Sequence, residues 1–411
     1  MDSKYHRNIP DGSVTTPLGF VAGATAAGIK QSGRPDLVLV VSERDCAAAG
    51  VFTRNQVPAA PVLLDRETLA GNASALRGVV INAGNANACT GEPGLADARE
   101  MQRLAADAVG ARPEQFLVMS TGVIGQPLPM DKVRTGVAAA AAALSPWAGV
   151  AAAQAIMTTD TRPKHAAVEV DLAGGRVSIG GMAKGAGMMH PNMATLLGVL
   201  TTDAAVAPAE LATLLRLATD ASFNVITIDG DTSTNDTVLL FANGAAGVVV
   251  DDEESRTRFA AALQEVCLQL AQMIVRDGEG VTKFVTVHVT GAATAEDARR
   301  VADTIATSPL VKTAFAGGDP NWGRIMMATG RSGATIDQRR LALWIAEPDA
   351  PPLQLVRDGT PAGYAESDAA AIFAQPEFTV HIDLGLGDGA ATLWTADLTH
   401  DYVTINADYR T

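Results

Sequence analysis

Short apolar runs recur along the first third of the chain, and two of them end at glycine. Residues 36–43 (DLVLVVSE), 78–84 (GVVINAG) and 116–122 (FLVMSTG) each hold a block of Val, Leu and Ile residues. Such blocks are typical of strands that are buried on both faces of a sheet. Residues 95–109, between the second and third runs, have the apolar spacing and the Ala, Leu, Arg and Met content of a helix. The pattern predicts strands that alternate with helices.

The middle of the chain continues the same alternation. A hairpin that turns at Gly174 and Gly175 is predicted from the patterns of residues 166–172 and 176–181. Residues 195–200 form an apolar run that directly follows a loop rich in glycine and proline. The other elements expected here are helices at 133–144, 151–157, 208–222 and 253–275, a strand pair formed by 224–228 and 237–241, and a strand at 283–289.

A polar stretch at residues 291–297 (GAATAED) suggests a boundary between two domains. We therefore expect a main layered α/β domain over residues 1–290 and a smaller α+β domain over residues 291–411. Within the smaller domain the pattern predicts a helix at 298–307 and strands at 341–345, 377–383 and 390–398.

Composition adds that the chain is a folded, acidic protein. Its 411 residues are 47% hydrophobic and 18% charged, a balance that disordered chains do not have. Aromatic residues make up only 4%, so the core must be built from small and branched side chains. The net charge of −14 disfavours binding to nucleic acids or to anionic membrane surfaces, because like charges repel.

Cysteine usage and the N-terminus indicate a cytoplasmic protein. Cys46, Cys89 and Cys267 are widely spaced and odd in number, so no disulfide framework or zinc site follows from them. The first residues lack the apolar region of a signal peptide, and no run reaches the roughly 18 apolar residues that a membrane span needs. We expect a reducing compartment, no membrane association and no bound metal.

Candidate chemistry is confined to polar, glycine-punctuated loops at the ends of apolar strands, since common nucleotide, zinc-protease and serine-hydrolase motifs are absent. Sites are often built on such loops, although each one taken singly is compatible with an ordinary turn. The loops are NAGNANACTG (82–91), STGVIG (120–125), KGAGMMHPNMATL (184–196), DGDTSTNDT (229–237), RDGEGVTK (276–283), FAGGDPNWGR (315–324) and NADYRT (406–411).

The third of these loops places a threonine, Thr195, at the start of a strand and directly after the small residue Ala194. A threonine hydroxyl is a weak nucleophile unless a base lies beside it. Cleavage of the chain just before such a threonine would turn its own α-amine into that base. The residues permit this chemistry, but a β-branched residue at a strand start is also an ordinary structural feature.

The string KGAGMMHPNMATLLGVLTTDA (184–204) resembles the processing site of the ornithine acetyltransferase/glutamate N-acetyltransferase family, also called the ArgJ family. The resemblance covers nearly the whole chain in the family's order. It continues in GVFTRNQVPAAPV, NAGNANACTG, STGVIG, IMTTDTRPK, SFNVITIDGDTSTNDT, RDGEGVTKF, AFAGGDPNWGRIMMATG and DYVTINADYRT.

The resemblance implies an α/β/β/α-like fold of the self-processing, N-terminal-nucleophile type. It implies self-cleavage at Ala194–Thr195 into an α chain, residues 1–194, and a β chain, residues 195–411. Thr195 would be the nucleophile, and Thr121 with Gly122 would form the oxyanion hole. The substrate-contacting positions that match the family are Thr158, Lys184, Thr195, Glu279, Asn406 and Thr411.

The implied reaction moves an acetyl group from N²-acetylornithine to glutamate through an ester on Thr195, which belongs to the cyclic arginine biosynthesis pathway. No cofactor is implied, although some members of the family also take acetyl-CoA as the acetyl donor. The family assembles as two α and two β chains. From the residue types, Lys184 suits the α-carboxylate that both substrates carry, and Glu279 suits the side-chain ammonium of ornithine.

Two other functions are compatible with the same residues. One is a self-processing aminopeptidase of similar fold, in which water or a peptide amine replaces glutamate as the acceptor. Such an enzyme would have no role for Lys184, Glu279, Asn406 and Thr411. The other is a metabolite-binding protein that never cleaves itself and shows no turnover.

Overall fold

The computed structural model describes residues 5–190 and 196–408. Internal contacts divide the chain into two compact units. Unit 1 holds the residues up to Asn224 together with Asp231–Ile274, and unit 2 holds Val225–Gly230 and the chain from Val275 onward. In the part of the chain that is described, no helix is long and apolar enough to cross a membrane.

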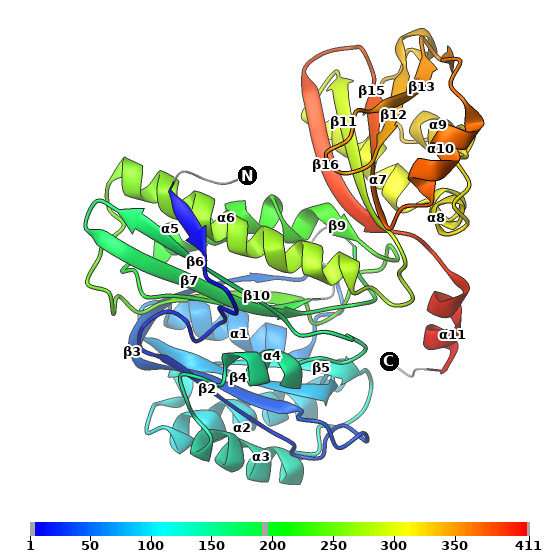
Figure 1. Cartoon of the computed structure of the whole chain (residues 1–411). Helices are drawn as coiled ribbons and strands as arrows, with labels where there is room; N and C mark the ends of the chain where they lie inside the picture. The colour runs from blue at the N-terminus through cyan, green and yellow to red at the C-terminus, as the bar shows by residue number, and fades with distance from the viewer. Residues whose placement is uncertain (1–4, 191–195, 409–411) are drawn as a thin grey trace. The chain divides into compact units, whose positions relative to one another are not determined.

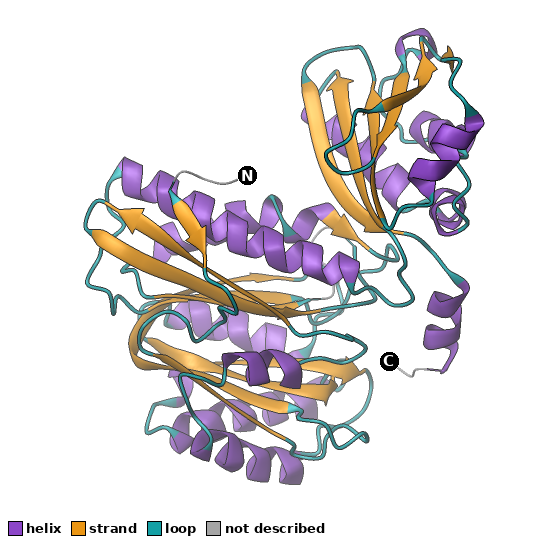
Figure 2. Cartoon of the chain, viewed as in Figure 1, coloured by secondary structure: helices purple, strands orange, loops and turns teal. Residues whose placement is uncertain are grey.

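Unit 1 contains two sheets that share one long, bent strand (Figures 1 and 2). Its strands are β1 (His6–Asn8), β2 (Phe20–Thr25), β3 (Leu37–Phe52), β4 (Leu76–Asn85), β5 (Phe116–Val123), β6 (Lys164–Leu172), β7 (Gly175–Lys184), β8 (Leu197–Thr202) and β10 (Thr237–Ala242). The first half of β3 pairs with β2 and β4, and its second half pairs with β10. One sheet therefore runs in the order β1-β6-β7-β8-β10-β3, and the other contains β2, β3, β4 and β5.

Side chains on the two faces of the second sheet pack in two separate hydrophobic cores. Val38 and Val40 of β3 pack in the core between the sheets, together with residues such as Val199 of β8. Leu37 and Leu39 point the other way and pack in the core beneath the helices. Successive side chains of a strand face opposite sides of the sheet, so a strand covered on both faces must be apolar throughout.

Helices cover the outer face of each sheet, which completes an α/β/β/α arrangement within unit 1 (Figure 1). The helices are α1 (Ala60–Gly71), α2 (Gly91–Ala108), α3 (Met130–Ala142), α4 (Gly149–Ala155), α5 (Pro208–Asp220) and α6 (Glu253–Arg276). On the first sheet, α5 packs against β3 and β10, and α6 lies over β7. On the second sheet, α2 packs against β4 and β5, and α3 packs against β2 and β3. α4 differs from the other helices, because it packs in the core between the sheets. The layered α/β fold expected from the sequence is confirmed.

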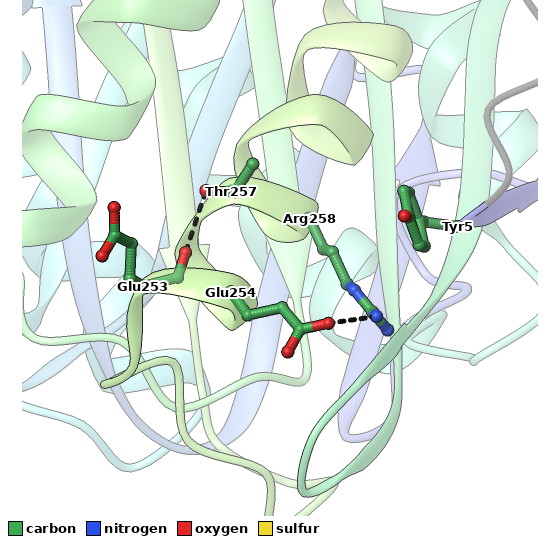
Figure 3. Close-up of a pocket in the computed structure, with 5 residues that line it drawn as sticks. All are labelled: Tyr5, Glu253, Glu254, Thr257 and Arg258. Atoms are coloured by element: carbon green, nitrogen blue, oxygen red, sulfur yellow. Dashed lines mark hydrogen bonds and ion pairs between the residues drawn. The ribbon is translucent and has the colours of Figure 1, made fainter.

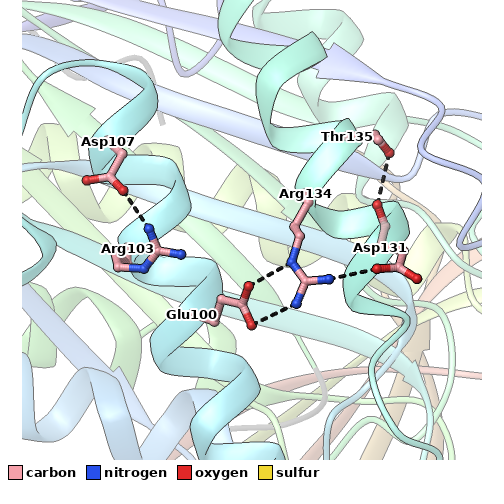
Figure 4. A network of polar contacts seen from close by, with 6 residues as sticks. All are labelled: Glu100, Arg103, Asp107, Asp131, Arg134 and Thr135. Carbon is pink, nitrogen blue, oxygen red and sulfur yellow. Dashed lines mark hydrogen bonds and ion pairs between the residues drawn. The ribbon is translucent and has the colours of Figure 1, made fainter.

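The two helices under the second sheet are joined on their exposed side by ion pairs (Figure 4). Arg134 of α3 bonds both carboxylate oxygens of Glu100 on α2, at 2.8 and 3.2 Å, and also contacts Asp131 at 2.7 Å. Arg103 and Asp107 form a further pair along α2. These side chains are solvated, so the pairs contribute little to stability compared with the apolar contacts beneath them.

The described residues of unit 2 form a seven-stranded sheet in the order β14-β13-β12-β15-β11-β16-β9, together with helices. Its strands are β9 (Ile226–Thr227), β11 (Phe284–Ala292), β12 (Ala342–Ala346), β13 (Leu353–Arg357), β14 (Thr360–Pro361), β15 (Glu377–Asp383) and β16 (Gly389–Ala396). Its helices are α7 (Ala295–Ala306), α8 (Pro309–Ala316), α9 (Trp322–Gly330), α10 (Glu366–Phe373) and α11 (His400–Asp408). The core of unit 2 joins alternate residues of β11, such as Val285 and Val287, to apolar faces of α7, α8 and α9.

The strand pair expected from residues 224–228 and 237–241 does not form, and that prediction was wrong. β9 pairs with β16 in unit 2, whereas β10 pairs with β3 and β8 in unit 1. Both segments are apolar enough to be strands, but an apolar run does not specify which strand it will pair with.

The chain leaves unit 1 before the polar stretch that suggested a boundary. Residue 291 lies inside β11, and this strand pairs with β15 and β16 along most of its length. Contacts therefore assign the whole of β11 to unit 2.

Candidate active site

Thr121 and Gly122 lie near the end of β5, where polar residues follow a buried apolar run. β4 and β5 are parallel, so their carboxyl ends meet at one edge of the sheet, with Thr121 opposite Ala83 and Gly122 opposite Gly84. Thr121 is 7% exposed. Its hydroxyl is thus held in an environment from which most water is excluded.

Gly122 occupies a position that other residues fit poorly. Its φ of +132° is a backbone conformation that L-residues rarely adopt. A Cβ atom at this position would lie 2.3 Å from the carbonyl carbon of Gly84 on the neighbouring strand. The two glycines therefore allow β4 and β5 to approach closely where the strands end.

Lys184 reaches the same place from the other sheet. It is the last residue of β7 and is 4% exposed. Its Nζ lies 3.4 Å from the Oγ1 atom of Thr121. β7 is paired with β8 so that Lys184 stands opposite Leu197. The backbone of Lys184 thus lies beside the first residue of β8.

Asp160 organises the backbone next to Lys184. This carboxylate is 3% exposed, and its Oδ1 accepts hydrogen bonds from Lys164 Nζ at 2.6 Å and from the Gly185 amide at 2.8 Å. Its Oδ2 accepts a hydrogen bond from the Thr158 amide at 2.9 Å. One carboxylate therefore fixes the segment that carries Thr158 and the residue that follows Lys184.

The charge of Asp160 is maintained by two lysines. Burial by itself would raise its pKa, but the positive charges of Lys184 and Lys164 outweigh burial and hold the pKa well below its usual range. The result is a buried group that contains two lysines and a carboxylate beside the Thr121 hydroxyl. The lysine charges suit an anionic ligand, in contrast to the acidic chain as a whole.

Ala194 and Thr195 lie outside the described residues, but the residue that follows them is described. Leu196 is buried, its amide donates to Asp236 Oδ1 at 3.0 Å, and its carbonyl oxygen accepts from the Thr237 amide at 3.1 Å. The start of β8 is therefore fixed on both sides by two consecutive residues at the start of β10.

Glu279 and Asn406 are brought together within unit 2. Glu279 lies in the loop that follows α6 and is 9% exposed. The Nδ2 atom of Asn406 on α11 donates a hydrogen bond to its Oε2 at 2.7 Å. Thr411, the remaining position expected from the resemblance, lies outside the described residues.

Asp397 supports the loop that carries Glu279. Its Oδ1 accepts hydrogen bonds from the amides of Thr282 and Lys283, at 2.9 and 3.0 Å. The hydroxyl of Thr399 donates to the carbonyl of Gly280 at 2.7 Å. These bonds connect the loop to the chain just before α11, which explains how Glu279 and Asn406 meet.

Sequence patterns alone did not single out Asp160, Asp236 or Asp397. The sequence does contain a signal that could have indicated Asp160. It lies four positions before Lys164, and both residues belong to a short polar segment between apolar elements. Asp236 belongs to the loop DGDTSTNDT, but that loop contains three aspartates and its pattern does not distinguish them.

A pocket at the start of α6 holds none of the expected site residues (Figure 3). It is lined by Tyr5, Glu253, Glu254, Thr257 and Arg258. Arg258 pairs with Glu254, and its guanidinium lies 4.5 Å from the ring centroid of Tyr5. The arginine is thus satisfied by its own neighbours, and we assign no chemistry to this pocket.

Comparison with known proteins agrees with the resemblance seen in the sequence. A protein of Symbiobacterium thermophilum named arginine biosynthesis bifunctional protein ArgJ is 54% identical over 405 residues, covering 97% of this chain and 99% of that protein. The protein of the same name from Geobacter sulfurreducens is 51% identical, covering 96% of this chain and 99% of its own length.

Two solved structures match about half of the chain. Ornithine acetyltransferase from Mycobacterium tuberculosis, solved in complex with ornithine, is 45% identical over 46% of this chain and 99% of that chain, with a TM-score of 0.43. Arginine biosynthesis bifunctional protein ArgJ from Bacillus halodurans is 39% identical over 46% of this chain and 98% of that chain, also with a TM-score of 0.43. The sequence pattern that defines the ArgJ family matches residues 21–411, so this chain belongs to the ArgJ family.

Proposed function

We propose that this chain transfers the acetyl group of N²-acetylornithine to glutamate, which yields ornithine and N-acetylglutamate for arginine biosynthesis. The observation that carries the proposal is the family match over residues 21–411, together with 54% identity to a protein named for arginine biosynthesis. The ornithine bound to the Mycobacterium tuberculosis relative supports the choice of substrate.

The proposed reaction begins with self-cleavage between Ala194 and Thr195, which gives Thr195 a free α-amine. That amine takes the hydroxyl proton as Thr195 Oγ1 attacks the acetyl carbonyl. Thr121 and Gly122 stabilise the oxyanion, the proton passes to the departing ornithine nitrogen, and the acetyl group remains as an ester on Thr195. The amine of glutamate then attacks the ester and releases N-acetylglutamate.

The buried charges of unit 1 support this reaction. Lys184 lies against the Thr121 hydroxyl, in register with the strand that Thr195 precedes in sequence. A desolvated ammonium here attracts the α-carboxylate common to acetylornithine and glutamate. Thr158, positioned by Asp160, supplies a further polar contact.

The ornithine side chain requires an acidic partner, and Glu279 is proposed for that role. Its bond with Asn406 orients the carboxylate without neutralising its charge. Thr411 is proposed as an additional substrate contact. These assignments rest on the family resemblance and on the chemistry of the residue types.

Three further features belong to the same proposal. Acetyl-CoA is a second acetyl donor, which would make the enzyme bifunctional, in keeping with the names of its relatives. The mature enzyme contains two α and two β chains. It works in the cytoplasm, as the cysteine usage and the charge balance of the sequence suggest.

One experiment separates this function from its rivals. Ornithine release from N²-acetylornithine is measured with and without glutamate, alongside the intact mass of the protein. Cleaved chains of residues 1–194 and 195–411 with glutamate-dependent release support the proposal. Cleaved chains whose release ignores glutamate indicate an aminopeptidase, and an intact chain that binds without turnover indicates a binding protein.

A further inference from the structure

α11, the helix that carries Asn406, buries none of its residues. Its nine residues, His400–Asp408, are all at least partly exposed, and Val403 is 62% exposed. Burial of apolar surface therefore contributes little to the position of this helix. A helix of this length is also too short to be stable by itself in water. The place of α11 within unit 2 thus depends on polar contacts made by individual residues.

One hydroxyl group joins the start of α11 to the loop that carries Glu279. Thr399 directly precedes the helix, and its Oγ1 atom donates to the carbonyl oxygen of Gly280 at 2.7 Å. The same atom accepts the amide hydrogen of Tyr402, in the first turn of α11, at 3.4 Å. A hydroxyl can make both bonds, because it has one donor hydrogen and two acceptor lone pairs. Thr399 therefore contacts both of the elements that meet at the Glu279–Asn406 hydrogen bond.

Gly280, the residue after Glu279, allows the loop and the helix to come this close. Its φ of +67° is a backbone conformation that L-residues rarely adopt. A Cβ atom at this position would lie 2.5 Å from the amide nitrogen of Tyr402 and 2.9 Å from Oγ1 of Thr399. Even alanine would push the loop away from the first turn of α11. The close approach thus needs a glycine in the loop as well as the threonine before the helix.

Asp397 gives Thr399 a fixed base. The Thr282 hydroxyl donates to Oδ2 of Asp397, in addition to the two amide hydrogen bonds that its Oδ1 accepts from the end of the loop. The amide of Leu398 donates to the carbonyl oxygen of Lys312 on α8 at 3.1 Å. The segment before α11 is therefore held by the core of unit 2, and Thr399 connects that fixed segment to the residue beside Glu279.

The pair formed by Glu279 and Asn406 can still bind a cation. Asn406 occupies one acceptor site of the Glu279 carboxylate, on Oε2, and a carboxylate has about four such sites. The amide of Asn406 is neutral, so it does not cancel the attraction between the carboxylate and an ammonium group. If the loop moved away from α11, this hydrogen bond would break and the carboxylate would no longer be held.

We propose that Thr399 is a positioning residue for substrate selection. By holding the Glu279 loop on the first turn of α11, it keeps Glu279 and Asn406 together as the group that selects an acetyl donor with a side-chain ammonium. The inference rests on the proposed function, in which Glu279 binds the ornithine side chain. Thr399 acts through the backbone of Gly280 and Tyr402, which it contacts directly.

Thr294 provides a matched control within unit 2. It directly precedes α7, and its Oγ1 atom accepts the amide hydrogen of Asp297 at 3.1 Å. Valine at either threonine removes a hydroxyl that bonds the first turn of a helix, so both changes weaken a helix start in the same way. Of the two threonines, Thr399 is the one that also bonds the loop beside Glu279.

The experiment compares Thr399→Val, Thr399→Ser and Thr294→Val in the full chain. The quantity measured is kcat/KM for N²-acetylornithine and for N-acetylnorleucine, which has a methyl group in place of the side-chain ammonium. If turnover of N-acetylnorleucine is too slow to measure, its inhibition constant replaces kcat/KM. The ratio between the two compounds reports selection for the ammonium, which a general loss of stability would not change.

The valine variant should lose selectivity. A hydrogen bond to a charged group is worth on the order of 10- to 100-fold in binding, and displacement of Glu279 would lose part of this. We expect Thr399→Val to lower kcat/KM for acetylornithine by at least about fivefold, chiefly through KM, and that for acetylnorleucine by less than about twofold. Thr399→Ser and Thr294→Val should stay within about twofold of the wild type for both compounds.

Three results would overturn the inference. They are an equal loss for both compounds in Thr399→Val, a failure of Thr399→Ser to recover, and the same loss of selectivity in Thr294→Val. Unchanged selectivity in Thr399→Val also contradicts it. If Thr399→Val does not fold, Gly280→Ala is used with the same criteria, because it forces the loop and α11 apart. Its control is Gly363→Ala, where φ is +74° and an added Cβ atom meets nothing within 4 Å.

Hydrogen exchange tests the contact without any turnover. Thr399→Val should speed the exchange of amides in residues 280–283 and in α11 together, relative to the wild type and to Thr294→Val. Unchanged exchange in these two segments overturns the positioning role. A wild type that releases no ornithine, or that does not prefer acetylornithine to acetylnorleucine, contradicts the proposed function itself. The exchange result still decides the role of Thr399 in that case, so the two failures are distinguished.

Discussion

The Nζ atom of Lys184 lies 3.4 Å from the Oγ1 atom of Thr121, although 63 residues separate the two in sequence. The contact joins the end of β7 in one sheet to the end of β5 in the other. Both residues are less than 10% exposed, so the interaction between the lysine charge and any developing negative charge is weakly screened. This pair is the centre of the candidate site in unit 1.

Replacing Thr121 with valine should impair the chemical step more than substrate binding. Valine keeps the shape of threonine but removes the hydroxyl proposed to stabilise the oxyanion. We expect kcat for ornithine release to fall by roughly 10²- to 10³-fold with a small change in KM, as for other oxyanion-hole donors. Thr121→Ser, which retains the hydroxyl, should keep most of the activity. A Thr121→Val enzyme with kcat within about twofold of the wild type would remove Thr121 from the proposed mechanism.

Gly122→Ala should destabilise the protein more than alanine at an exposed turn glycine. Gly110, in the turn after α2, has a φ of +68°, and a Cβ atom added there would have no other atom within 4 Å. Alanine at Gly110 carries only the backbone penalty of about 1–2 kcal/mol. Gly122→Ala adds a collision with Gly84, worth a further ~1–3 kcal/mol. Urea unfolding of both variants checks the difference, and equal losses would show that the close approach of β4 and β5 is not required.

Asp160→Asn should destabilise the protein at neutral pH, because it removes a buried carboxylate that interacts with the charges of Lys164 and Lys184. Breaking a buried ion pair from one side typically costs about 3–5 kcal/mol. The sign of the pH dependence follows from the lowered pKa of Asp160. Its stabilisation is complete above the unfolded pKa of about 3.9 and is lost as the pH falls through the lower folded value.

The corresponding measurement is the melting temperature of wild type and Asp160→Asn from pH 8 down to acid. The difference between the two melting temperatures should stay constant down to about pH 5 and decrease only at lower pH. Asp171→Asn, which removes an exposed carboxylate paired with Arg176, serves as the control and should change the melting temperature little. A gap that closes already near pH 6 would contradict the lowered pKa.

Lys312 of α8 should make the stability of the protein rise with pH. Burial lowers its pKa to about 7, and the charges of Asp397 and Asp229 only partly oppose this. Between that value and the unfolded value near 10.5 the unfolded chain binds the extra proton. The free energy of unfolding therefore increases as the pH rises through this window.

Lys312→Met should remove that increase, by on the order of 1 kcal/mol or more between pH 6 and pH 9. Chemical unfolding at the two pH values measures it, with Lys132→Met as the exposed control. Methionine also loses the bonds from Lys312 Nζ to Thr395 Oγ1 and to the Ala396 carbonyl, so the pH dependence is the diagnostic quantity and not the absolute stability. Identical pH slopes for wild type and Lys312→Met would contradict the assignment.

Local patterns predicted individual strands well where both faces of the strand are covered by apolar layers. The runs at 78–84 and 116–122 became β4 and β5, because an apolar block ending in glycine fits a strand buried between helices and a second sheet. The run at 36–43 continued to Phe52, since small residues such as Ala47–Ala49 can pair in a second sheet although they are weak strand formers. α1 and α11 were not anticipated, because both lie in segments noted only for their motifs.

The sequence by itself determined the family, the residue types of the chemistry and the layered α/β class. These depend on motifs and on alternation along the chain, which are local properties. Only the tertiary structure decided that Lys184 meets Thr121, that Asp160 holds Thr158 and Gly185, and that β9 and β10 join different sheets. The physical reason is that strand partners and register are selected by burial and backbone hydrogen bonding across the whole fold. Residues far apart in sequence are brought together by those choices, and no local pattern records them.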